Sequence, residues 1–337
     1  LKSFEENKKE YIRLVEVFKA HNIGYFFYNG GNDSADTAYK VSQISKKLGY
    51  PINCIAIPKT VDNDLAETDC CPGFGSAAKY IATSTMEASL DVASMSETST
   101  KVFILEVMGR HAGWMAASSA LARIDQKDAP HIILLPEIRF NQIKFLNKVK
   151  DVIKRNGYCV IVASEGVKNS KGRFLAESDT RDAFGHSQLG GVAPYLGGLI
   201  SQKLNLKNHW AVSDYLQRSA RHISSKTDLL HAEAVGVYAV KYAMKGMNGV
   251  MPIIVRSKGE KYSWKIMPAP LSKIANVEKK LPNSFISKDG FNVTAKAIKY
   301  LKPLIQGEAY PKFKNGIPHS QKLKLVEVKK KLPNWKG

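Results

Sequence analysis

The stretch that decides the fold runs from the largely apolar segment Ile52-Asn53-Cys54-Ile55-Ala56-Ile57 into Pro58-Lys59-Thr60-Val61-Asp62-Asn63-Asp64. Upstream, a second apolar run, Ile23–Tyr28, leads in the same way into Gly30-Gly31-Asn32-Asp33-Ser34. Each is a passage from a strand to a loop, one loop rich in glycine and the other carrying paired carboxylates. Either loop alone could be an ordinary surface turn, because turns and binding sites use the same residue types. Together they predict the two halves of a site for phosphoryl transfer.

The rest of the chain continues the same alternation. Further apolar runs at 102–107, 131–135 and 158–163 predict strands, and a long helix is expected from about Gly75 to Ser96. Ser3-Phe4-Glu5-Glu6 is read as a capping box that starts a first helix. Continuous apolar strands separated by helices predict an α/β fold with a parallel sheet covered on both faces. Ligands bind such sheets at the carboxyl ends of the strands, where both loops lie.

Composition narrows the class of protein. The chain has 337 residues, of which 44% are hydrophobic, which predicts a globular protein of two lobes. It contains no apolar stretch of about 20 residues that could cross a bilayer. Its four cysteines have no metal-ligand spacing, so we expect a cytoplasmic protein.

The net charge of +20 allows two kinds of partner, nucleic acid or small anionic substrates. Most lysines are scattered, and only Lys329-Lys330-Lys331 forms a cluster. Because no nucleic-acid-binding motif accompanies them, the pattern favours small anions and predicts neither a nucleic-acid nor a membrane partner.

The two loops have the chemistry of a phosphate and metal site. Gly30 and Gly31 let the backbone approach a phosphate, and the helix expected to start near Ser34 would direct its positive end at the same anion. One carboxylate of the second loop can hold a metal ion while the other accepts a proton. Lys59 adds positive charge to that loop. Oxygen ligands for Mg²⁺ are available from Asn32, Asp33, Asp62 and Asp64.

Three later strand ends offer complementary groups. Arg110, after Met108-Gly109, is a candidate for neutralising the transferred phosphoryl group. Glu165 is suited to hold sugar hydroxyls, and Tyr215 with Arg218 to hold a sugar phosphate. Each of these signals alone is weak. His111 and His186 have no second ligand at a useful spacing, which favours structural or supporting roles for them.

These motifs, in this order, resemble the phosphofructokinase family, and specifically its pyrophosphate-dependent branch, over essentially the whole chain. The resemblance implies two Rossmann-like lobes with mainly parallel sheets covered by helices and an active site in the cleft between them. The phosphoryl-donor lobe would comprise 1–77 and 219–265, the fructose 6-phosphate lobe 78–218, and a C-terminal extension 266–337. Its most specific markers are Pro58–Asp64, Met108-Gly109-Arg110, Glu165-Gly166, Phe184-Gly185-His186 and Tyr215–Arg218.

The resemblance also implies a reaction and roles for residues. The family phosphorylates the 1-hydroxyl of fructose 6-phosphate with Mg²⁺, reversibly where pyrophosphate is the donor, in glycolysis or gluconeogenesis, and as homodimers or homotetramers. Asp62 matches the catalytic base, Thr60 and Arg110 match groups that stabilise the moving phosphoryl, and Gly30 and Gly31 match the donor site. Asn32 and Asp64 match the metal site. The substrate-binding positions are Thr60, Val61, Asp62, Met108, Gly109, Arg110, Glu165, Tyr215 and Arg218.

Two positions indicate the phosphoryl donor. ATP-using relatives carry glycine where this chain has Asp33, and a carboxylate there would clash with the α-phosphate of the nucleotide and repel it. Lys59 replaces a second glycine and can hold pyrophosphate. An ATP-dependent member of the family, a catalytically silent regulatory subunit and an RNA-binding module are the alternatives.

Three departures from the family pattern accompany the resemblance. Asn32 stands where many members have an aspartate that binds Mg²⁺ through solvent. Lys101 and His209 stand where bacterial ATP-dependent members place arginines that reach across a subunit interface. The family's first strand and its glycine-rich loop would precede Leu1, so we expect the chain to be a fragment.

Overall fold

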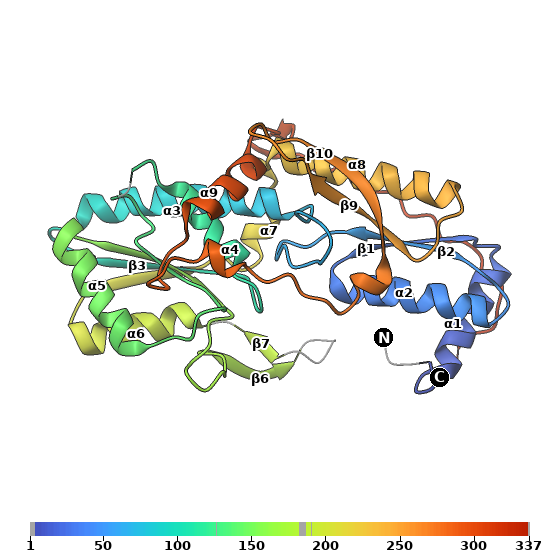
Figure 1. Cartoon of the computed structure of the whole chain (residues 1–337), viewed down its shortest axis with the longest axis horizontal. Helices are drawn as coiled ribbons and strands as arrows, with labels where there is room; N and C mark the ends of the chain where they lie inside the picture. Colours follow the sequence, from blue (N-terminus) through green and yellow to red (C-terminus); the bar gives the residue numbers. More distant parts are fainter. Residues whose placement is uncertain (1–3, 126, 182–186, 190, 336–337) are drawn as a thin grey trace.

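Two four-stranded sheets organise the molecule. The computed structural model describes residues 4–125, 127–181, 187–189 and 191–335. One sheet has the order β1-β2-β9-β10 and the other the order β4-β5-β3-β8. Figure 1 shows the first sheet in the right half of the molecule and the second in the left half. Their strands are β1 (Tyr25–Gly30), β2 (Asn53–Pro58), β9 (Val250–Arg256), β10 (Trp264–Pro270), β3 (Val102–Val107), β4 (Ile132–Leu134), β5 (Cys159–Ser164) and β8 (Asn208–Val212).

Helices cover both faces of each sheet. In the right half, α8 lies above the sheet and α2 below it, and α3 lies above the left-hand sheet with α5 and α6 below (Figure 1). The larger helices are α1 (Lys8–Ala20), α2 (Asn32–Lys47), α3 (Phe74–Met95), α5 (Gln142–Asn156), α6 (Val192–Leu204) and α8 (Lys226–Met244). Shorter elements are α4 (Trp114–Ser118), α7 (Leu216–Ser219), α9 (Ala295–Leu301) and the strand pairs β6 (Glu177–Arg181) with β7 (Ser187–Leu189) and β11 (Phe313–Lys314) with β12 (Ile317–Pro318).

The predicted α/β fold with two mostly parallel sheets is confirmed. Every pairing in the second sheet is parallel, and in the first sheet β1, β2 and β9 are parallel. The exception is β10, which pairs antiparallel with β9 at the sheet edge. An antiparallel edge strand on a parallel sheet is common in this architecture, because a short connection suffices to reach it.

One local prediction was wrong, and a second differs from the structure by two residues. The first helix begins at Lys8 after Asn7, not at the capping box, of which Ser3 lies outside the described residues. The strand predicted at Ile23–Tyr28 is Tyr25–Gly30, and it is not buried on both faces. Because β1 is the edge of its sheet, the side chains of Tyr25 and Phe27 are exposed.

The segment after residue 265 is built into the body of the protein. The strand β10 continues the first sheet to Pro270, across the boundary expected at 265. Further on, Ala297 and Leu301 of α9 are fully buried in the largest core cluster, together with Ile254 of the first sheet and Leu105 of the second. That cluster therefore joins the two sheets through the C-terminal region. The lobe boundaries themselves stay a prediction.

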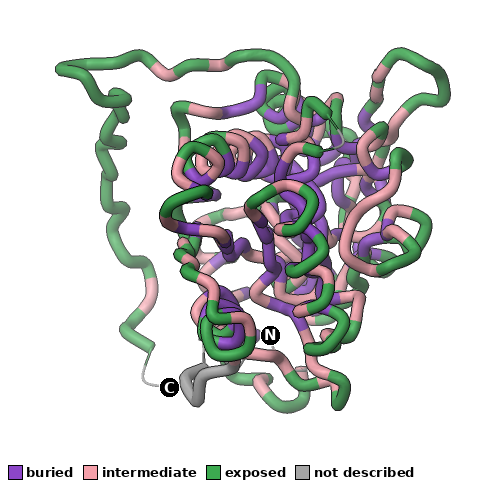
Figure 2. The backbone as a smooth tube through the Cα atoms, turned by 90° about the vertical axis from the view of Figure 1, so that its left-hand side faces the viewer, coloured by how far each residue is buried: buried purple, intermediate pink, exposed green. Residues whose placement is uncertain are grey.

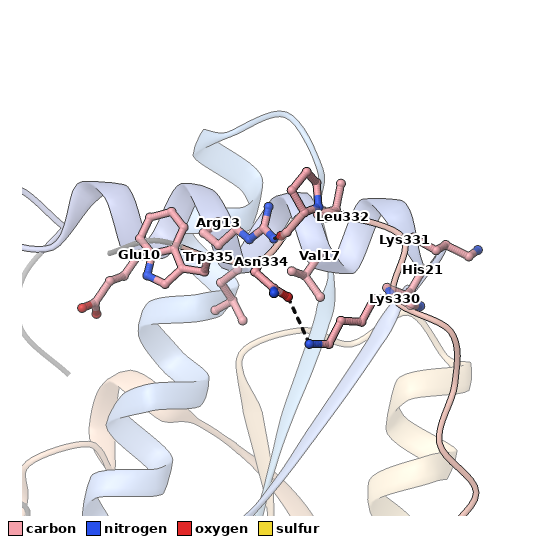
Figure 3. A pocket seen from close by; sticks show the side chains of 11 residues that line it. Glu10, Arg13, Val17, His21, Lys330, Lys331, Leu332, Asn334 and Trp335 are labelled. Atoms are coloured by element: carbon pink, nitrogen blue, oxygen red, sulfur yellow. Dashed lines mark hydrogen bonds between the residues drawn. The ribbon is translucent and has the colours of Figure 1, made fainter.

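The last residues return to the first helix. The segment 319–332 is almost entirely exposed, and Figure 2 shows it as an arm beside the body. Its end packs on α1, where the Arg13 side chain donates to the Pro333 carbonyl and lies 6.0 Å from the centre of the Trp335 ring. A cavity of about 490 Å³ lies at this contact (Figure 3). Among the described residues, no helix is long and apolar enough to cross a membrane.

Candidate active site

The two loops singled out in the sequence lie side by side. Parallel pairing aligns the ends of β1 and β2, with Gly30 opposite Pro58. The backbone N–H of Lys59 donates to the Gly30 carbonyl at 3.0 Å. A Cβ built on Gly31 would lie 3.8 Å from the Cβ of Thr60, so the glycine loop and the carboxylate loop are in contact. The carboxyl ends of neighbouring parallel strands thus form one edge, as predicted.

Asn63 shapes the carboxylate loop from within. It has a φ of +53°, a left-handed conformation that asparagine tolerates better than most residues, and it is fully buried. Its side chain accepts from the Cys71 N–H at 2.9 Å and donates to the Tyr300 hydroxyl at 3.1 Å. The turn between Asp62 and Asp64 is therefore held by the protein interior rather than by solvent.

The C-terminal region braces the same loop from outside. The N–H of Lys279 donates to the Asp64 carbonyl at 2.6 Å. The ammonium of Lys279 donates to the carbonyls of Thr68 and Asp69 at 2.9 and 2.8 Å. Sequence reasoning missed Lys279 and Tyr300, because nothing in the local pattern around either residue refers to a loop more than 200 residues away.

The two carboxylates of the loop are electrostatically coupled. Burial raises the pKa of Asp62, while the charges of Arg110, Lys59 and His111 and a hydrogen bond from Thr60 oppose the rise. Burial first and the charge of Asp62 second raise the pKa of Asp64 to about 6. Like charges held close together disfavour double ionisation, so the pair can take up a proton near neutral pH. This is the behaviour required of a general base.

The loop after β3 is held against the end of β5. Gly109 has a φ of +135°, its N–H donates to Glu165 Oε1 at 3.3 Å, and its carbonyl accepts from the Ser164 hydroxyl at 2.6 Å. A Cβ on Gly166 would lie 2.5 Å from the Gly109 carbonyl oxygen and closer still to that of Arg110. Only glycine at 166 lets the two loops approach this closely.

Glu165 links the two sheets electrostatically. Burial raises its pKa to about 7, the hydrogen bond from Gly109 opposes the rise, and the charge of Asp62 adds to it. Arg110 acts on both Asp62 and Glu165. Charged groups at the ends of β2, β3 and β5 therefore act on one another electrostatically, while their catalytic and binding roles stay a prediction.

The loop 213–218 is fastened to the same edge by Gln217. This residue is buried, accepts from the Met108 N–H at 3.2 Å and donates to the Asp214 carbonyl at 2.8 Å. Sequence reasoning passed over Gln217 because it looked like one polar residue among several in its loop. Its neighbours Tyr215 and Arg218 pack on each other, with the guanidinium 4.1 Å from the ring centre. Tyr215 is 62% exposed, so it is available to a ligand.

The structure defines the expected metal ligands less sharply than the carboxylate loop and its partners. In the orientation that satisfies its surroundings, the Asn32 amide donates to the carbonyls of Val277 and Ile274 at 3.2 and 3.1 Å. Its amide nitrogen thus ties the start of α2 to the segment after β10. In the described part of the chain, no three His, Cys, Asp or Glu side chains are grouped so as to hold a metal ion. Mg²⁺ commonly uses one or two carboxylates and completes its shell with substrate phosphates and water, and the Asp62–Asp64 loop fits that pattern. The Phe184-Gly185-His186 motif lies outside the described residues.

Comparison with known proteins identifies the family of the chain. The phosphofructokinase family profile matches residues 1–243. A protein of Xanthomonas campestris pv. campestris, named pyrophosphate–fructose 6-phosphate 1-phosphotransferase, is 58% identical over 339 residues, covering 100% of this chain and 81% of its own. A protein of the same name from Rhodospirillum rubrum is 39% identical over 95% of this chain and 78% of its own.

Solved structures agree with this placement. The pyrophosphate-dependent phosphofructokinase of Marinobacter aquaeolei superposes with a TM-score of 0.89 at 56% identity, covering 97% of this chain and 79% of its own. The enzyme from Nitrosospira multiformis gives 0.90 at 56% identity over 98% and 79%. A yeast phosphofructokinase at 20% identity and a TM-score of 0.59 shares the fold.

Proposed function

Because this chain belongs to the phosphofructokinase family, we propose that it transfers a phosphoryl group reversibly between pyrophosphate and the 1-hydroxyl of fructose 6-phosphate. The observation that supports this most is the convergence on Asp62 of Arg110 from the second sheet and Lys59 from its own loop. A half-buried carboxylate on which two cations act electrostatically suits an acceptor hydroxyl that must lose a proton and a phosphoryl group that must be neutralised.

Asp62 acts as the general base in this mechanism. Its carboxylate takes the proton of the 1-hydroxyl as the oxygen attacks the terminal phosphorus of pyrophosphate. Arg110 and Thr60 stabilise the equatorial oxygens, and phosphate leaves toward Lys59. Phosphoryl transfer depends mainly on positioning and charge neutralisation, which this arrangement supplies.

The sugar phosphate would bind on the second-sheet side. Glu165 accepts hydrogen bonds from sugar hydroxyls, while Tyr215 and Arg218 take the 6-phosphate. Met108 and Gly109, after β3, would face the sugar from the second sheet, and Thr60 and Val61, after β2, from the first. The hydrogen bond from the Met108 N–H to Gln217 would hold the loop after β3 beside the loop that carries Tyr215 and Arg218.

The donor side has a helix N-terminus and a selecting carboxylate. Gly30 and Gly31 precede α2, whose positive end favours an anion. Asp33, in the first turn of α2, would repel the α-phosphate of ATP, while Lys59 attracts pyrophosphate. Mg²⁺, held by Asp64 with Asn32 nearby, would supply charge that neutralises the pyrophosphate oxygens. As a homodimer or homotetramer, the protein would place Lys101 and His209 near a neighbouring subunit.

The test compares donors in both directions. Formation of fructose 1,6-bisphosphate is measured with pyrophosphate and with ATP, and phosphate-dependent formation of pyrophosphate is measured in reverse. Activity with pyrophosphate and little with ATP is expected. Use of ATP with no use of pyrophosphate would overturn the donor assignment.

A variant of the base tests the mechanism. Asp62→Ala should lower kcat by about 10²–10⁴-fold, the usual contribution of a general base. Asp91→Ala, an exposed carboxylate on α3, is the matched control and should leave kcat unchanged. An active Asp62→Ala protein would rule out the assigned role.

A further inference from the structure

One histidine–carboxylate hydrogen bond joins loops that belong to different sheets. His111 directly follows Arg110 in the loop after β3, and its Nδ1 lies 2.5 Å from Glu278 Oε1. The backbone of Glu278 forms an isolated antiparallel bridge with Leu65, next to Asp64. On one side, His111 is the chain neighbour of Arg110, and on the other, Glu278 is bridged to Leu65, the chain neighbour of Asp64.

The segment that carries Glu278 is held independently of His111. It crosses from the right-hand sheet to α4 in the middle of the molecule, where it is drawn in orange (Figure 1). Next to Glu278, Lys279 donates to carbonyls of the 64–69 loop. The Trp114 indole donates to the Lys279 carbonyl at 2.9 Å. These hydrogen bonds fix the position of Glu278, so its contact with His111 can hold the end of the Arg110 loop in place.

Each residue of the pair acts electrostatically on one carboxylate of the Asp62–Asp64 loop. His111 is among the charges that act on Asp62, and Glu278 is among those that act on Asp64. The imidazole of His111 also stacks on the Phe174 ring, with 6.4 Å between the ring centres. The Lys168 ammonium lies 4.9 Å from the centre of the same Phe174 ring. Each side chain of the pair is 36% exposed.

We propose that His111 and Glu278 are positioning residues that hold Arg110 in register with Asp62 across the two sheets. This inference rests on the proposed function. Half-exposed ion pairs add little to global stability, because water screens the charges. A displacement of about 1 Å at a reacting group, by contrast, can cost about 100-fold in rate. The pair should therefore matter for turnover far more than for folding.

A double-mutant cycle tests the pair. His111→Gln, Glu278→Gln and the double variant are assayed at saturating pyrophosphate and fructose 6-phosphate. Each single change should lower kcat about 10-fold, and the double variant should be no slower than the slower single variant, because one interaction is lost once. KM values should stay within about twofold, since the pair orients reacting groups rather than binding substrate.

The control is a lysine–glutamate ion pair away from the site. Lys79 of α3 lies 2.7 Å from Glu308 in the C-terminal region. Lys79→Gln with Glu308→Gln should leave kcat unchanged. The proposal fails if the two His111–Glu278 effects multiply, if kcat is unchanged, or if the control pair slows turnover equally.

Amide hydrogen exchange separates this proposal from the proposed function. Glu278→Gln should speed exchange at residues 109–112 by at least about tenfold while β3 stays protected. A parent protein that is inactive with pyrophosphate would refute the proposed function. The exchange result would still show whether the His111–Glu278 pair holds the Arg110 loop. Unchanged exchange at 109–112 would refute the positioning role of the pair even in an active enzyme. Glu278→Asp, which keeps the charge, should recover part of both effects, and no recovery would count against the pair.

Discussion

Replacing Gly166 by alanine should move the loop that carries Arg110 and slow the reaction while the protein stays folded. A Cβ at this position would sit 2.5 Å from the Gly109 carbonyl oxygen, and closer to that of Arg110. Real Cβ contacts keep at least 3.0 Å, so the Gly109 oxygen must retreat by about 0.5 Å and the Arg110 oxygen by more. Both neighbours are backbone atoms, which no side-chain rotation can clear.

The displacement is transmitted to the chemistry directly. Arg110 neutralises the phosphoryl group in the proposed mechanism, so a shift approaching 1 Å should lower kcat by about 100-fold, or about 2.7 kcal/mol of barrier. Overpacking should also reduce the free energy of unfolding by about 1–3 kcal/mol. Steady-state kinetics with pyrophosphate, run well below the melting temperature found by circular dichroism, separate the two effects.

Gly198→Ala provides the matched control. Gly198 is exposed on α6, and a Cβ there would meet nothing within 4 Å. This change should stabilise the protein by about 0.5–1 kcal/mol and leave kcat unchanged. A Gly166→Ala protein with full activity and an unchanged melting temperature would refute the close approach of the two loops.

Three further outcomes follow from particular side chains. Asp33→Gly should raise kcat/KM for ATP at least about tenfold if the carboxylate excludes the α-phosphate, and equal exclusion of ATP by the variant would contradict that reasoning. Burial raises the pKa of Glu165 to about 7, so between pH 4.5 and 7 the folded state keeps a proton that the unfolded chain releases. Stability relative to Glu165→Gln should therefore fall by the order of 3 kcal/mol as pH rises from 5 to 8, and a rise in that difference would refute the shift. Asp228→Ala removes the acceptor of the Gly73 and Ser76 N–H groups at the start of α3 and should cost about 3 kcal/mol in urea unfolding, with a loss below 1 kcal/mol as the contrary result.

Local pattern was enough for much of the fold. The runs at 52–57 and 158–163 are mostly apolar because they are largely buried, and both form strands one residue from the predicted bounds. Their loops were expected at the carboxyl ends of the strands, where ligands bind parallel sheets, but only the structure shows that β2 and β5 belong to different sheets. The edge position of β1 was not readable, because an aromatic run looks the same in a central strand and at an edge.

The sequence by itself determined the chemical inventory: the glycine loop, the Asp62–Asp64 pair, Arg110 and Glu165, each marked by its place after an apolar run. Only the tertiary structure decided what holds them. Lys279 and Tyr300 form hydrogen bonds that hold the carboxylate loop, and Gln217 joins Met108 to the loop 213–218. The physical reason is that a hydrogen bond between residues 100 or more positions apart leaves no periodicity in either segment, so the chain had to fold before those partners could be recognised.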